Sequence, residues 1–90
     1  MVWNYRVIEH DGNFYIHEVY YNADGDICAI SEDPMHPYGE TLQKLMSDIG
    51  HFLQAITRPV LKKEKIRFAA MDGVPRRQVK RKKRSAANAR

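Results

Sequence analysis

The residues most able to do chemistry in this chain are cations near its C-terminal end. Lys80 to Arg84 form an unbroken basic run, and two further arginines precede it. Clustered lysine and arginine side chains neutralise phosphates and release counterions, which gives affinity without sequence specificity. We predict that this segment contacts nucleic acid or another polyanion, and the alternative is a segment that only keeps the chain in solution. The predicted binding residues are Arg76, Arg77, Lys80, Arg81, Lys82, Lys83 and Arg84.

A metal site is not predicted from the remaining candidate ligands. Asn22, Asp24 and Asp26 have the spacing of the first calcium-loop ligands, but Ile27 occupies the sixth position, where that loop needs glycine. A tight hairpin turn explains the same residues better. The histidines match no compact zinc spacing, and there is no second cysteine to complete such a site. These histidines are His10, His17, His36 and His51. We therefore expect neither a metal nor a cofactor.

Nucleophilic catalysis is not indicated either. Cys28 is the single cysteine and stands among alanine and isoleucine, where it is expected to behave as a small hydrophobic side chain. The sequence contains no glycine-rich phosphate loop, no nucleophile elbow and no acid pair of defined spacing. We therefore predict that the chain is not an enzyme. A single cysteine excludes an internal disulfide framework and favours a reducing, cytoplasmic setting.

The chain of 90 residues has room for one domain, and its charge is divided unevenly. Residues 1–61 carry three basic and nine acidic residues, a net charge of −6, whereas residues 62–90 carry twelve basic and two acidic residues, a net charge of +10. No apolar run approaches the roughly 20 residues of a membrane helix, and the N-terminus lacks the pattern of a secretory signal, so no membrane contact is expected.

Two hairpins are predicted before residue 32. Trp3, Tyr5 and Val7 alternate with polar residues, as in a half-buried strand. Asp-Gly pairs at 11–12 and 24–25 supply the positive φ angles that tight turns need. The first turn joins this stretch to residues 14–21, and the second joins residues 14–21 to residues 27–31. The strands therefore form an antiparallel meander. Pairing through a two-residue turn at 11–12 places Tyr5 opposite Glu18 and Val7 opposite Ile16.

One face of this sheet is expected to form the core and the other to remain available to a partner. The face with Trp3, Tyr5 and Val7 is the more apolar, and the pairing adds Phe14, Ile16, Tyr20, Ile27 and Ala29 to it. The opposite face is amphipathic, which favours a protein-contact surface. Its predicted contact residues are Val19, Tyr21 and Ile30.

A helix is predicted between the proline-containing loop at 32–39 and Pro59. Thr41 is the expected N-cap, and Glu40 suits the positive end of the helix dipole. Seven apolar residues follow the helical period and are predicted to cover the sheet: Leu42, Leu45, Met46, Ile49, Phe52, Leu53 and Ile56. Ile66 and Phe68 alternate with basic residues, which favours a fourth, edge strand over a short helix in this region.

Several short blocks resemble a family of small bacterial proteins with no assigned function. These blocks are Trp3-x-Tyr5-Arg6-Val7-Ile8, Glu18-Val19-Tyr20-Tyr21-x-x-Asp24-Gly25, Gly39-Glu40-Thr41 and Arg58-Pro59-Val60-Leu61. More loosely, three strands, a Gly-Glu-Thr block and one amphipathic helix resemble the HicB-type antitoxin domain. That resemblance implies a domain that binds a small toxin ribonuclease. The chain departs from the pattern in its loop at 32–39 and in its C-terminal segment.

The sequence thus predicts an α+β fold: an antiparallel sheet of three strands, or of four if residues 66–68 form an edge strand, with one helix on a face. We expect a β-β-β-α domain over 1–61, an extension over 62–75 and a disordered basic tail over 76–90. The predicted function is a non-catalytic interaction module whose tail contacts nucleic acid nonspecifically. The alternative is a HicB-like or dimerising protein-binding domain that uses the sheet face or edge.

Overall fold

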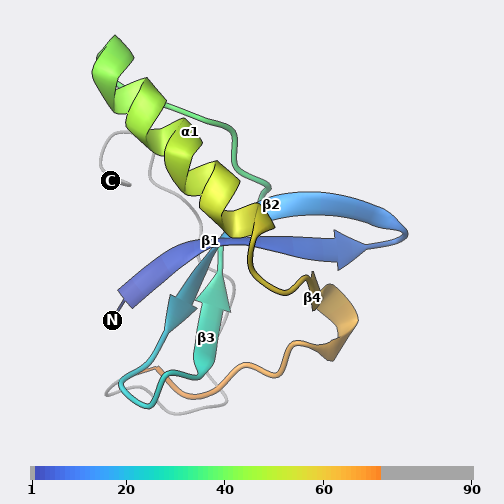
Figure 1. Ribbon diagram of the computed structural model, residues 1–90. Coiled ribbons are helices and arrows are strands. Elements are labelled where there is room, and N and C mark those ends of the chain that lie inside the picture. The colour runs from blue at the N-terminus through green and yellow to red at the C-terminus, as the bar shows by residue number, and fades with distance from the viewer. Residues whose placement is uncertain (1, 72–90) are drawn as a thin grey trace.

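One α-helix packs against a four-stranded mixed sheet in the computed structural model, which describes residues 2–71 (Figure 1). The sheet order is β3-β2-β1-β4, and the α+β class predicted from the sequence is confirmed. The elements are β1 (Val2–His10), β2 (Asn13–Tyr21), β3 (Ile27–Ile30), α1 (Leu42–Ile56), β4 (Leu61–Lys62) and a single-turn 3-10 helix, η1 (Lys63–Lys65).

The first hairpin has the predicted turn and register. Asp11 and Gly12 adopt φ angles of 52° and 78°, so both central residues lie in the left-handed region that a two-residue hairpin turn requires. This turn sets β1 antiparallel to β2, and the predicted pair of Tyr5 with Glu18 is confirmed. One face of the hairpin therefore carries Tyr5 and Glu18 side by side.

The second hairpin is confirmed in part. The predicted pair of Tyr20 with Ala29 is present, but the next pair joins Tyr21 to Ile27, so Cys28 is an extra residue between them. A shift of one residue in register reverses the face of the side chains beyond it, here that of Ile27. Ile27 therefore packs with the residues opposite to those predicted for it.

Helix α1 begins and ends where its sequence predicts. The Thr41 hydroxyl accepts a hydrogen bond from the backbone N–H of Lys44 at 3.1 Å, which confirms Thr41 as the N-cap. The helix ends at Ile56, and Thr57 is its C-cap, so Pro59 follows just beyond the last turn.

The fourth strand differs from the predicted one in position and direction. Strand β4 is the pair Leu61–Lys62, which runs parallel to β1 opposite Ile8 and Glu9. Residues 66–71, which include the predicted strand at 66–68, form no regular element. They run on to β3, where the backbone N–H of Ala69 donates to the carbonyl of Ile27 at 2.7 Å. Their alternating apolar side chains pack on a sheet face without joining the sheet.

The fully buried apolar cluster lies on the sheet face that was predicted to be available to a partner. Ile8, Val19 and Ile30 have no exposed surface and form this cluster. Leu61, Ile66 and Phe68 cover it from the chain beyond α1. The helix and this covering segment lie on opposite sides of the sheet, as Figure 1 shows. Residues 61–71 therefore complete the core.

Candidate interaction surface

The three predicted partner-contact residues are part of the core. Val19 and Ile30 are fully buried, and Tyr21 is half-buried against them. The prediction that they form a partner surface is wrong because residues 61–71 supply the apolar cover that a partner was expected to supply. A surface for a partner has to be found elsewhere on the described part of the chain.

The seven predicted polyanion-binding residues, from Arg76 to Arg84, lie outside the described residues, so their role stays a prediction.

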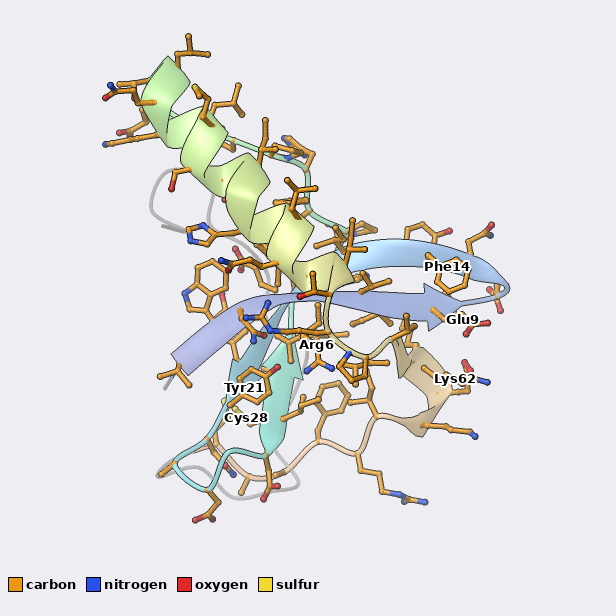
Figure 2. The ribbon with its side chains drawn as sticks, in the orientation of Figure 1. Arg6, Glu9, Phe14, Tyr21, Cys28 and Lys62 are labelled. Atoms are coloured by element: carbon orange, nitrogen blue, oxygen red, sulfur yellow. The ribbon has the colours of Figure 1, made fainter. Side chains whose placement is uncertain are left out.

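Arg6, near the N-terminus, links two parts of the fold through its side chain. Its Nη1 donates to the Tyr21 hydroxyl at 3.1 Å, and its Nη2 donates to the Pro59 carbonyl at 2.8 Å. Figure 2 labels Arg6 and Tyr21 on the side of β1 away from α1. Arg6 thus fixes the turn after α1 to the central strands.

Helix α1 is held to the sheet by a buried carboxylate. Asp48 is 2% exposed, and its Oδ1 accepts a hydrogen bond from the Tyr5 hydroxyl at 2.8 Å. Its Oδ2 accepts from the backbone N–H of Tyr38, also at 2.8 Å. Charge-assisted hydrogen bonds of this kind are the strong ones in proteins. Asp48 therefore joins the helix, strand β1 and the loop before the helix.

Aromatic side chains complete this contact. The rings of Tyr5 and Phe52 lie 4.4 Å apart between centroids, and the Trp3 and Tyr5 rings form a T-shaped pair with 5.2 Å between centroids. Ala55 is fully buried one turn further along the helix. Beside these residues, Tyr20 donates to the buried Glu18 carboxylate at 2.6 Å. The helix face that meets the sheet is therefore formed by Asp48, Phe52 and Ala55.

This contact turns most of the helix's apolar surface away from the sheet. Five of its large apolar residues are between 40% and 72% exposed, and we call them the α1 ridge: Leu42, Met46, Ile49, Leu53 and Ile56. Of the seven residues predicted to cover the sheet, only Leu45 and Phe52 are half-buried. The prediction is wrong for the ridge because Asp48, bonded to Tyr5, sets the rotation of the helix about its axis.

The ridge is open along the length of the helix. In Figure 1 the N-terminal half of α1 reaches beyond the sheet, and among residues 2–71 it is the loop before the helix that runs beside it. Figure 2 shows side chains along this helix that project into open space. Isolated apolar residues on a protein surface are ordinary, whereas a contiguous apolar patch rimmed by polar residues marks an interaction site. The α1 ridge is the candidate functional site of the described chain.

The other residues considered for chemistry have structural partners. His17 is buried, and its Nδ1 lies 3.0 Å from the Ser31 carbonyl. The Asn22 side chain accepts from the backbone N–H groups of Asp24 and Asp26, as in a turn. Within residues 2–71, no three histidine, cysteine or acidic side chains gather as metal ligands would.

A small pocket lies on the opposite side of the helix from the ridge. It has a volume of about 150 Å³ and is lined by Trp3, Asn4, Tyr5, His51, Gln54 and Arg58. Sites for drug-sized ligands and cofactors usually have volumes of about 300–1,000 Å³. This pocket is therefore smaller than such sites.

Sequence reasoning identified the ridge residues as apolar and helical but assigned them to the core. The available signal was their spacing: 42, 46, 49, 53 and 56 follow alternating steps of four and three, typical of a helix-pairing seam.

In residues 2–71 there is no helix long and apolar enough to span a bilayer. No protein-family model, curated protein or solved structure matches this chain.

Proposed function

We propose that this chain is a small non-catalytic interaction module. Its folded part binds a protein through the α1 ridge, and its basic segment at 76–84 contacts nucleic acid without sequence specificity. The observation that carries the proposal is the exposure of five large apolar residues along one helix face. A small domain has few apolar side chains with which to build its core, and those that stay exposed to water do not stabilise the fold. An exposed apolar face of this extent therefore favours a binding role.

The charge distribution supports the second half of the proposal. The described residues 2–71 carry seven basic and ten acidic side chains, a net charge of −3, so they do not favour contact with phosphates. The predicted polyanion-binding residues concentrate seven positive charges within nine positions. We infer that attraction to nucleic acid comes from that segment alone and that the folded part supplies the protein contact.

Nucleic-acid binding across a salt series tests this assignment. We compare the full chain with a full-length variant in which the seven basic residues from Arg76 to Arg84 are replaced by glutamine. Log K of the unchanged chain for duplex DNA should fall with log salt by about 0.9 for each phosphate neutralised, and the variant should lose nearly all binding. Equal melting curves by circular dichroism control for folding. Binding that survives in the variant would contradict the proposal.

A second candidate is the HicB-like, antitoxin-type domain that uses a sheet edge. One observation favours it. Strand β4 pairs with β1 only at Ile8 and Glu9, so among residues 2–71 no strand pairs with the same edge of β1 before Ile8. A peptide could add a strand there. Hydrogen exchange separates the two modes, because a partner at this edge protects amides of β1, whereas a partner at the ridge leaves their exchange unchanged.

A further inference from the structure

The α1 ridge has the spacing of a seam between two paired helices. Its residues repeat every 3.5 positions on average, which is the period that keeps a seam facing a partner helix. The ridge covers all 15 residues of α1, a length of about 22 Å. A partner helix of similar length therefore fits this surface better than a loop or a single side chain would.

The borders of the ridge carry no charge. On the side away from the sheet, the neighbouring helix positions are Gln43, Gly50 and Thr57, and all three are exposed. On the other side they are the half-buried Leu45 and Phe52. A Cβ added at Gly50 would meet nothing within 4 Å, so the backbone there is open to close approach. Two identical ridges can therefore meet without opposing like charges.

The C-terminal segment of the same chain does not suit the ridge. Residues 76–90 contain eight basic residues and one large aliphatic residue, Val79, which cannot pair with five large apolar side chains. The occupant must therefore come from another molecule and be apolar along a helix. A second copy of this chain meets both conditions because it presents the same ridge.

The exposed area is enough for such a pair. From the exposed fractions, the ridge presents about 550 Å² per copy, so pairing two copies buries at most about 1,100 Å². Interfaces of standard size bury about 1,200–2,000 Å², so the expected dimer lies just below them, among the weak associations. Antiparallel helices also place opposite ends of their dipoles together.

We infer that two copies of this chain pair through their α1 ridges, antiparallel about a two-fold axis beside Ile49. The inference rests on the proposed function, because it names the protein that binds the ridge. In the pair, Leu42 of one copy lies near Ile56 of the other, and Ile49 lies near its own equivalent. Pairing also joins two basic segments in one particle, so nucleic-acid contact becomes bivalent.

Sedimentation equilibrium of the full chain tests the pairing. From about 1 µM to about 1 mM, the mass should rise from 10.5 kDa towards twice that value. Leu53→Glu places a charge in the ridge and should weaken pairing about 100-fold or more. Ser47→Glu is the matched control, because it adds the same charge to an exposed position on another side of the helix, and it should leave the mass curve unchanged.

The orientation has its own readout. Ile49→Cys should form a disulfide between copies, whereas Leu42→Cys should not, because only a parallel pair places Leu42 near its own equivalent. The native Cys28 is fully buried. A mass of 10.5 kDa at every concentration overturns the inference, as does a dimer unaffected by Leu53→Glu. A disulfide between copies of Leu42→Cys, or none between copies of Ile49→Cys, overturns the antiparallel arrangement. A monomer that still binds nucleic acid through its basic segment would overturn the pairing alone and leave the proposed function standing.

Discussion

Removing one hydroxyl group should loosen helix α1 from the sheet. In Tyr5→Phe, the ring that packs on Phe52 is kept, but Asp48 loses the 2.8 Å hydrogen bond to its Oδ1. Because Asp48 is 2% exposed, water cannot readily replace the missing donor. A hydrogen bond to a charged group contributes about 1.5–3 kcal/mol. We expect the free energy of unfolding to fall by about 2 kcal/mol.

For a chain of this size, that loss lowers Tm by roughly 8–16 °C. The assay is urea and thermal unfolding followed by far-UV circular dichroism at low micromolar concentration, where the monomer dominates. Tyr38→Phe is the matched control, since Tyr38 also bonds Asp48, but through its backbone N–H, and the residue is 41% exposed. That variant should change stability by less than about 0.5 kcal/mol. Equal effects of the two substitutions would refute the anchoring role of Asp48.

Two glycines should respond to alanine in opposite directions. Gly50→Ala should raise stability by about 1 kcal/mol in dilute solution, because the new methyl group meets open space within a helix; a loss in urea unfolding would contradict this. Gly39→Ala should lower stability, because its Cβ would collide with the backbone nitrogen of Leu45; unchanged unfolding would show that the loop before α1 can move aside.

Local patterns predicted the elements that depend on neighbouring residues. The Asp-Gly turn at 11–12 sets the register of β1 and β2, and Thr41 begins the helix, because both effects act within a few residues. The bulge at Cys28 and the parallel strand β4 depend on contacts between distant segments. Short alternation at Ile66 and Phe68 did not distinguish a paired strand from an extended segment lying over the core.

The candidate site was misassigned for a related reason. A stripe of seven apolar residues fits a core-facing helix, but it does not show how the helix is rotated about its axis. The contact between Tyr5 and Asp48 sets that rotation, and it joins residues 43 positions apart. The sheet face with Val19 was misassigned because the chain after Pro59 returns to cover it. Both errors come from contacts that no local period reveals.

The central claim is that the α1 ridge is an open surface that closes when copies of the chain associate. Methyl NMR with a soluble nitroxide tests it directly, because the probe broadens only accessible methyl groups. In dilute solution, Leu53 and Ile56 should broaden, and Ile8 and Ile30 should remain sharp. At high concentration, the ridge methyl groups should become protected. Ridge signals that stay sharp when dilute, or stay equally broadened when concentrated, would contradict the account.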